Sequence, residues 1–125
     1  MAQVTAILVD THFALWVRVV PRELRPGERA AIDDSAPRYV SIVSLWEIAV
    51  LQTVGRLQRD PALLEPPSGF ALLPLHLEHC SACAGLPLHH RDPFDRMLIA
   101  QSMQEDWPIV TADPAFKKYP VQVIW

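Results

Sequence analysis

VTAILVD, residues 4–10, is the stretch that decides the fold class of this 125-residue chain. Its first six residues form a short, continuous apolar run with β-branched side chains, which is typical of a strand buried in a parallel sheet. Asp10 ends the run, and Thr11 is the expected N-cap of a helix that continues through HFALWVRVV until Pro21. A buried strand that leads directly into a helix is the arrangement from which α/β proteins are built.

The same alternation continues to the end of the chain. Ser44 is the expected N-cap of a helix that ends at Gly55, and the proline-rich residues 60–69 are the expected loop. Further helices are predicted at 28–32, 77–84 and 92–105, and further strands at 39–42, 70–74, 108–111 and 121–124. The pattern predicts an α/β fold, a three-layer sandwich with a central, mostly parallel sheet flanked by helices. The length suits a single domain over residues 1–125.

Composition narrows the class of protein. Half of the residues are hydrophobic, which argues against a disordered tail. No apolar run approaches the ~18 residues of a membrane span, and the first residues lack the basic start and the cleavage site of a signal peptide. Two cysteines do not make a disulfide framework, so we expect a cytoplasmic protein with no membrane contact. The net charge of −3 does not decide against a nucleic-acid partner, because acids gathered in one site would leave the remaining surface basic.

Two aspartates follow predicted strands directly. Asp10 comes after VTAILV, and Asp113 ends PIVTAD, in which Thr111 adds a hydroxyl. The carboxyl ends of the strands border the crevice where ligands bind in open α/β sheets. A turn residue is the alternative role for each aspartate, and the sequence leaves that choice open.

Glu47 lies in the apolar stretch VSIVSLWEIAVLQTVG and is the one charged residue between Arg38 and Arg56. Ser44 and Glu47 have the spacing of a capping box, which explains both residues without any chemistry. A carboxylate with apolar flanks is nevertheless expected near buried surface, and charged groups are rarely buried without a partner. We therefore favour a functional role for Glu47.

HHRDPFDRMLIA, residues 89–100, contains two aspartates three positions apart. Asp92 fits an N-cap, Pro93 fits the first helical position and Asp95 fits the third, where a negative charge favours the positive end of the helix. Residues three apart share a helix face, so both carboxylates can also point at one spot. Capping and chemistry are therefore compatible in this stretch.

Four segments that are distant in sequence each deliver an acid to a strand end or a helix start. These acids are Asp10, Glu47, Asp95 and Asp113. Packed together, the carboxylates would repel one another strongly unless a cation were bound. Hard cations with oxygen ligands, Mg²⁺ or Mn²⁺, fit such a set. The site would suit attack of water on a phosphodiester, since the metal neutralises charge on the phosphoryl oxygens.

Four stretches occur in a fixed order from residue 7 to residue 119. They are ILVDTHFALW, VSIVSLWEIAV, LPLHHRDPFDRMLIAQSM and PIVTADPAFKKY. Together they resemble a PIN-domain ribonuclease, specifically the VapC-type toxins of bacterial toxin–antitoxin pairs. The resemblance implies a PIN-like fold and an Mg²⁺- or Mn²⁺-dependent endoribonuclease, whose products carry a 5′-phosphate and a 3′-hydroxyl.

The resemblance also assigns roles to the acids. The acidic positions of the family map onto Asp10, Glu47, Asp95 and Asp113. By that mapping Asp10 and Asp95 would be direct metal ligands, while Glu47 and Asp113 would complete the pocket. Asp92 would cap its helix and assist. The resemblance further implies an RNA substrate, a cognate antitoxin protein that covers the groove, and a homodimer.

Several basic side chains flank the predicted site. His12, one turn from the first aspartate, can touch substrate or pack against the protein, and we favour packing. Arg91 and Arg96 can contact RNA phosphates or remain solvated, and the sequence leaves both roles open. His89 and His90 are expected in solvent or against RNA, because hard cations prefer oxygen ligands.

Two further features have both a packing and a functional interpretation, and packing is favoured for each. Trp16 and Trp46 fall on apolar helix faces and are expected in the core rather than stacked on bases. HLEHCSAC, residues 76–83, invites a zinc site, but a single CxxC is a weak signal and cysteine also packs as a small hydrophobe. The zinc candidates share one helix face and are His76, His79, Cys80 and Cys83.

Two features depart from the family pattern. Leu51 stands four positions after the site glutamate, where relatives often carry a basic residue, and this removes a phosphate contact or a charge that balances the acids. Residues 58–68 are short and proline-rich where relatives often place another helix. The second departure affects the expected RNA groove and partner surface rather than the metal pocket.

Two other classes of protein compete with the nuclease. A phosphatase with an aspartyl nucleophile after the first strand needs a second acid two residues later, and His12 stands there instead. A weak or inactive PIN-like domain would act as a protein- or RNA-binding module. The intact acids argue against such a module, whereas Leu51 leaves room for it.

Overall fold

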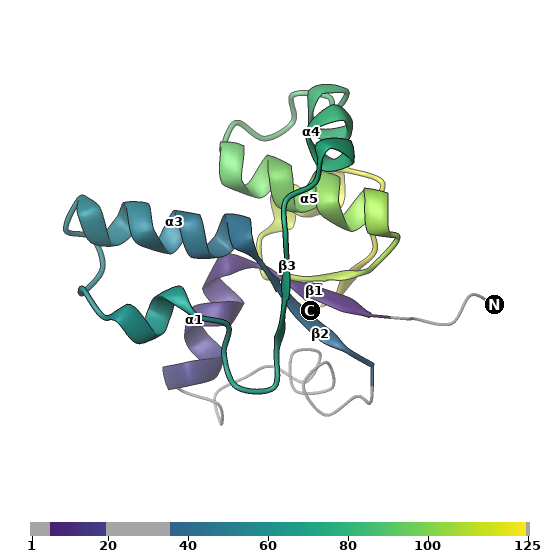
Figure 1. The fold of residues 1–125 in the computed structure, drawn as a ribbon. Coiled ribbons are helices and arrows are strands. Elements are labelled where there is room, and N and C mark those ends of the chain that lie inside the picture. The colour runs from purple at the N-terminus through teal and green to yellow at the C-terminus, as the bar shows by residue number, and fades with distance from the viewer. Residues whose placement is uncertain (1–5, 20–35, 125) are drawn as a thin grey trace.

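The centre of the molecule is a five-stranded sheet with the strand order β3-β2-β1-β4-β5. The structure is a computed structural model that describes residues 6–19 and 36–124 (Figure 1), so the helix predicted at 28–32 lies outside the described residues. The strands are β1 (Ile7–Val9), β2 (Arg38–Ser41), β3 (Ala71–Leu73), β4 (Ile109–Val110) and β5 (Val123–Ile124). The pairings between neighbouring described strands are parallel throughout, which confirms the predicted parallel sheet.

Helices alternate with these strands, as the sequence predicted. The described α-helices are α1 (Thr11–Val19), α3 (Ile42–Thr53), α4 (Leu77–Ala84) and α5 (Pro93–Glu105). Two short 3-10 helices, η2 (Pro61–Leu64) and η3 (Pro114–Lys118), follow α3 and β4. Helix α3 lies against α1, α5 and η2, and α4 packs on α5. Within the described ranges, no helix has the length and apolar character needed to cross a membrane.

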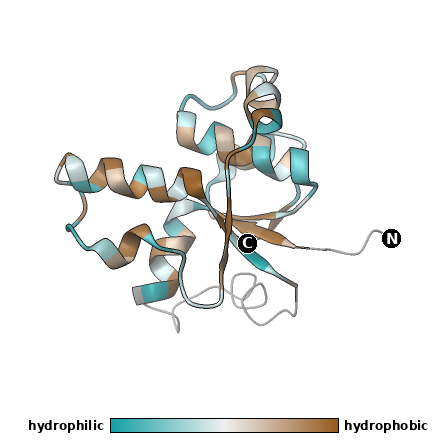
Figure 2. Ribbon diagram, viewed as in Figure 1, coloured by the Kyte–Doolittle hydropathy of each residue, from teal (hydrophilic) through white to brown (hydrophobic). Residues whose placement is uncertain are grey.

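The apolar core lies on both faces of the sheet, because successive side chains of a strand point to opposite sides. Ile7 and Val9 of β1 pack with Phe13 of α1 on one face. Leu8 packs on the other face, with Leu98 of α5 among its neighbours. Figure 2 shows the corresponding hydrophobic colouring along β1. The arrangement confirms a three-layer sandwich in which a buried sheet is covered by helices on each side.

The two helix caps predicted near the site are wrong by a few residues. Asp10, and not Thr11, caps α1, because its Oδ1 accepts a hydrogen bond from the amide three positions on (2.8 Å). Ser41, and not Ser44, caps α3, since its Oγ accepts from the amide two positions on (3.0 Å). In both places the strand runs into the helix without an intervening turn. The hydroxyls of Thr11 and Ser44 are therefore available to each other, 3.0 Å apart.

The stretch predicted as a loop at 60–69 contains the 3-10 helix η2. Helix α3 ends just before Gly55, whose φ of 77° lies in the left-handed region that favours glycine. The segment then forms η2, and Arg18 of α1 donates hydrogen bonds to the carbonyls of Ala62 and Glu65. These hydrogen bonds from Arg18 connect the proline-rich stretch to α1.

Candidate active site

Three of the four predicted acids line a single pocket of about 350 Å³. Asp10 directly follows β1, Asp113 follows β4, and Asp95 lies in the first turn of α5. The exposed side chains of His12 and Trp16 also line the pocket. The site therefore lies at the carboxyl ends of two adjacent central strands, where α/β proteins place their ligands.

Asp10 is held in one orientation by two hydrogen bonds. The side chain is only 6% exposed, and its Oδ1 accepts from the amide of Phe13. The second oxygen, Oδ2, accepts from the hydroxyl of Thr111 (2.6 Å). The same hydroxyl oxygen accepts from the amide of Asp113 (3.1 Å), so Thr111 connects the two acidic strand ends.

Asp92 and Asp95, at the start of α5, have different roles. Asp92 is the N-cap, as predicted, because its Oδ1 accepts from the amides of Phe94 (2.9 Å) and Asp95 (3.1 Å). The carboxylate of Asp95 instead lines the pocket. Burial, and then the nearby charge of Asp92, raise the pKa of Asp95 to about 6.

Glu47 does not line this pocket, but it interacts with the same group of acids. Its Oε1 accepts a hydrogen bond from the hydroxyl of Thr11 (2.6 Å), so the predicted capping box with Ser44 does not form. Burial raises the pKa of Glu47, and the charges of Asp92 and Asp10 raise it further. The hydrogen bond from Thr11 opposes that shift, because it stabilises the ionised form.

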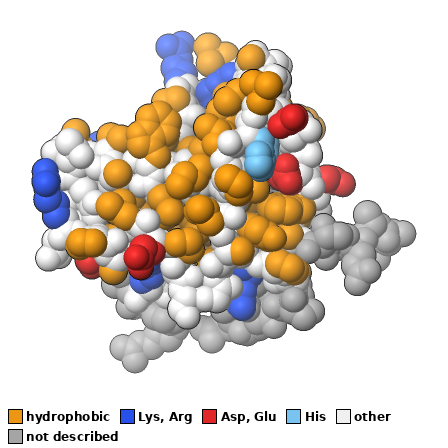
Figure 3. All heavy atoms as spheres, viewed as in Figure 1, with side chains coloured by type: hydrophobic (Ala, Val, Ile, Leu, Met, Phe, Trp, Pro, Cys, Tyr) orange, Lys and Arg blue, Asp and Glu red, His pale blue; other side chains and the backbone are white. Residues whose placement is uncertain are grey.

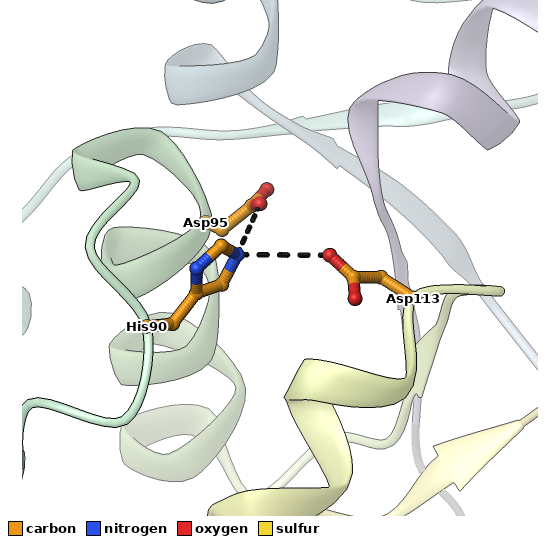
Figure 4. Close-up of side chains that lie close together, drawn as sticks. All are labelled: His90, Asp95 and Asp113. Atoms are coloured by element: carbon orange, nitrogen blue, oxygen red, sulfur yellow. Dashed lines mark hydrogen bonds and ion pairs between the residues drawn. The ribbon is translucent and has the colours of Figure 1, made fainter.

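His90, expected beside the site in solvent or against RNA, instead contacts two of the site carboxylates. Its Nε2 lies 2.8 Å from Oδ2 of Asp95 and 3.6 Å from Oδ2 of Asp113, so it contacts both carboxylates (Figure 4). In the described part of the chain, these three residues form the group whose potential metal-ligating atoms lie within 4.8 Å of one another. His90 is in the loop before α5, and a loop path cannot be deduced from helical or strand periodicity.

The sequence left Arg96 open to phosphate contact or to solvent, and in the structure its guanidinium binds backbone carbonyls. Its guanidinium donates to the carbonyl oxygens of Pro87 (3.0 Å), Cys83 (3.3 Å) and Leu86 (3.3 Å). These hydrogen bonds connect the end of α4 and the loop that follows it to the first turn of α5. Arg91 is exposed beside a second, more apolar pocket that Trp46 also lines.

The prediction that both tryptophans lie in the core is wrong. Trp16 is 48% exposed, and Trp46 is 61% exposed. Trp16 lines the acidic pocket, whereas Trp46 makes an edge-to-face contact with Phe94 at 4.9 Å between ring centroids. Apolar periodicity identified the helix faces correctly, but these faces extend beyond the part that the core covers.

The histidines and cysteines of α4 do not form a metal-binding group among the described residues. His79 is fully buried, and its Nδ1 accepts from the amide of His76 while its Nε2 lies 3.0 Å from Glu105 Oε2. Cys80 is exposed, so the expected close packing of both cysteines is wrong for this one. In this helix, the side chain that packs in the interior is the imidazole of His79.

The model of the PIN domain family matches residues 7–122, nearly the whole chain. The chain belongs to the PIN domain family. A curated PIN-domain relative, Ribonuclease VapC22 of Mycobacterium tuberculosis, is 26% identical over 123 residues and is aligned over 92% of each chain.

Solved structures show the same PIN fold at low sequence identity. A chain of VapBC2 from Rickettsia felis, bound to a DNA fragment from its promoter, is 12% identical with a TM-score of 0.69, covering 94% of this chain and 96% of that chain. A chain of DNA-bound VapBC from Salmonella typhimurium is 18% identical with a TM-score of 0.69 and the same coverage. A toxin–antitoxin complex from Klebsiella pneumoniae contains a chain that is 17% identical with a TM-score of 0.64, covering 96% of this chain and 97% of that chain.

Proposed function

We propose that this PIN domain is a metal-dependent endoribonuclease that acts in the cytoplasm as the toxin of a toxin–antitoxin pair. The observation that carries the proposal is the meeting of Asp10, Asp95 and Asp113 in one pocket at the carboxyl ends of the strands. The ribonuclease name of the curated relative and the toxin–antitoxin complexes among the structural neighbours support the same function.

The donor set fits Mg²⁺ or Mn²⁺. Asp10 and Asp95 would ligate the cation, and Asp113 and Glu47 would complete the acidic pocket. Burial beside other acids raises the pKa of Asp95, so a bound divalent cation would relieve a real cost of ionisation. When bound, the metal supplies Lewis-acid stabilisation of charge on phosphoryl oxygens and makes water more acidic.

The chain itself supplies fixed orientations for the site. Thr111 and the amide of Phe13 hold both carboxylate oxygens of Asp10, which limits reorganisation during the reaction. Thr11 holds one carboxylate oxygen of Glu47. Water is the attacking group in this proposal, so no side chain has to form a covalent intermediate with RNA.

Side chains at the edge of the pocket suit a single-stranded substrate. The exposed ring of Trp16 offers a surface on which a base can stack, and His12 lies beside it in the same pocket. Arg91 is exposed and free of the loop carbonyls that engage Arg96, so we assign an RNA phosphate contact to Arg91 and not to Arg96.

An antitoxin that covers the acidic pocket is the second partner in this proposal. Carboxylates gathered in one place would attract a basic side chain of that protein. Such a partner would block RNA and metal together, and this would restrain the nuclease. The toxin–antitoxin complexes among the structural neighbours support this choice of partner.

A homodimer is the expected assembly. We define the β3 apolar face as Trp46, Leu72, Leu75, Leu77 and Leu88, all of them exposed. Figure 3 shows hydrophobic side chains gathered over the middle of the side on which β3 lies. Leu77 is 78% exposed, and β3 is an edge strand of the sheet. Large apolar patches and open strand edges mark association surfaces, and a second copy would cover both.

The alternative is a weak or inactive PIN domain that only binds RNA or protein. Leu51 favours it, because this position on α3, one turn after Glu47, offers no positive charge to a phosphate. A mixed pool of structured RNAs distinguishes the two functions when the wild-type protein is added with Mg²⁺, with Mn²⁺ or with EDTA.

Internal cuts in Mg²⁺ or Mn²⁺, absent in EDTA and leaving 5′-phosphate ends, are the expected result. Cuts that persist in EDTA would contradict the proposed metal dependence. RNA binding without cleavage in either metal would favour the binding module instead.

A further inference from the structure

One atom each of His90, Asp95 and Asp113 lie within 4.8 Å of one another, as ligands around one cation would. Nε2 of His90 faces Oδ2 of Asp95 and Oδ2 of Asp113, and Asp10 lines the same pocket (Figure 4). We propose that His90 is a nitrogen ligand of the metal and makes the site prefer Mn²⁺ to Mg²⁺. This inference rests on the proposed function and specifies the chemistry of its metal site.

The distances are those of atoms in one coordination shell. Ligand atoms at right angles around a cation with bonds of ~2.1 Å lie ~3 Å apart. The nitrogen of His90 lies 2.8 Å and 3.6 Å from the two carboxylate oxygens, values on either side of that separation. A cation can therefore replace the direct contacts between these groups without a large movement of any of them.

The loop that carries His90 is fixed before any metal binds. The hydroxyl of Tyr119, which is buried, accepts hydrogen bonds from the amides of His89 (3.1 Å) and His90 (2.8 Å). The same hydroxyl donates to the carbonyl of Pro87 (3.0 Å). Arg96 holds the loop from the side of α5. A ligand on a loop anchored in this way loses little freedom when it binds, which favours coordination.

The negative charge of the two carboxylates exceeds what one imidazole can balance. In the part of the chain that the structure describes, His90 is the side chain that forms ion-pair contacts with Asp95 and Asp113. A divalent cation carries two positive charges and so balances both carboxylates, and an imidazole nitrogen can ligate it.

A nitrogen ligand changes which cation is favoured. Mg²⁺ requires nearly ideal octahedral oxygen coordination and retains most of its water. Imidazole is a better ligand for first-row transition metals, while carboxylates suit Mg²⁺ and Mn²⁺ alike. Of the two cations proposed for this site, two aspartates with one histidine therefore favour Mn²⁺, which is a first-row transition metal and also accepts carboxylate ligands.

The first test is pulsed EPR of Mn²⁺ bound to the full chain without RNA. We expect a ¹⁴N coupling in the wild type that is lost in His90→Ala and retained in the controls His12→Ala and His89→Ala. Retention in His90→Ala, or loss in either control as well, would overturn the assignment. Asp95→Asn should prevent Mn²⁺ binding altogether, and unchanged binding in that variant would refute the proposed metal site itself.

The second test compares affinities by titration with Mn²⁺ and by competition with Mg²⁺. His90→Ala should weaken Mn²⁺ binding by at least the ~10-fold that loss of a residue supporting a metal ligand costs, and should leave Mg²⁺ binding nearly unchanged. Equal weakening of both metals would mean that His90 only positions Asp95. Tighter binding of both would mean that it competes with the cation. Either result overturns the inference while leaving the nuclease proposal intact.

Discussion

At the scale of single residues, the hydroxyl of Thr11 lowers the pKa of the site glutamate, Glu47. Its hydrogen bond to Glu47 opposes the rise in pKa that burial causes. Thr11→Val keeps the shape and removes the bond, so we expect a higher pKa for Glu47 and roughly tenfold slower cleavage, as for other supporting residues. The pH dependence of the cleavage rate should show its acidic limb moved to higher pH.

Thr53→Val is the matched control for that experiment. Thr53 is an exposed threonine of α3 whose hydroxyl donates to the carbonyl of Ala49 (2.8 Å). Its replacement should leave both the rate and the pH profile unchanged. An acidic limb that stays in place in Thr11→Val would show that this hydroxyl does not act on Glu47.

Also at the residue scale, the raised pKa of Asp95 makes the stability of the folded protein depend on pH. Its pKa in the folded protein is about 6, above the ordinary value of 3.8. A raised pKa contributes stability that is present below the unfolded value and lost as pH rises through the folded value. In EDTA, the wild type should therefore lose stability between about pH 4 and pH 7 through this group.

Asp95→Asn removes that loss. In EDTA the melting temperature of the variant should exceed that of the wild type by a few degrees at neutral pH, and the difference should shrink toward about pH 4. Thermal unfolding at several pH values measures it. A sharp fall in melting temperature at neutral pH would instead mean that the negative charge of Asp95 stabilises the positive end of α5.

At the scale of elements, α5 begins where local chemistry predicts, and α1 and α3 do not. Asp92 and Pro93 give an unambiguous start to α5. Thr11 and Ser44 were equally good cap residues, but each strand continues directly into its helix. Asp10 and Ser41, the residues at those junctions, therefore become the caps. Local propensity cannot choose between neighbouring cap residues when strand pairing decides where the helix begins.

The cap of α5 can be tested apart from its charge. Asp92→Ala removes the acceptor of two amide hydrogen bonds and should lower the free energy of unfolding by about 1 kcal/mol. Asp92→Ser keeps an acceptor and removes the charge, so its stability should stay close to wild type. Urea unfolding of the three proteins in EDTA checks this. Equal destabilisation by both substitutions would argue for a role of the charge rather than the cap.

At the scale of the whole molecule, the sequence predicted the parallel α/β sandwich and most of its elements. Buried strands and helix periodicity are local signals, and the acids at strand ends followed from them. The contact of His90 with the carboxylates and the exposure of Trp16 did not follow. The first depends on a loop held by Tyr119 and Arg96, and the second depends on how far neighbouring elements cover α1. Both are products of tertiary contacts.

The β3 apolar face makes a prediction at the same scale. Leu75→Arg or Leu77→Arg would bury an unpaired charge in a dimer interface, so either should weaken a homodimer strongly. Light scattering coupled to size-exclusion chromatography measures the assembly. Leu64→Arg is the control, because Leu64 is also exposed but lies on η2. A monomeric wild type, or equal dissociation by the control, would contradict the proposed dimer face.

The acids of the pocket are proposed to form one catalytic site. The most direct test is cleavage of an RNA that the wild type cuts, in Mn²⁺ and in Mg²⁺, by wild type, Asp95→Asn and Asp106→Asn. Asp106 ends the same helix in an exposed, left-handed conformation that asparagine also adopts, so it is a matched control. We predict that Asp95→Asn abolishes cleavage while remaining folded and that Asp106→Asn cleaves normally. Normal cleavage by a folded Asp95→Asn variant would contradict the account.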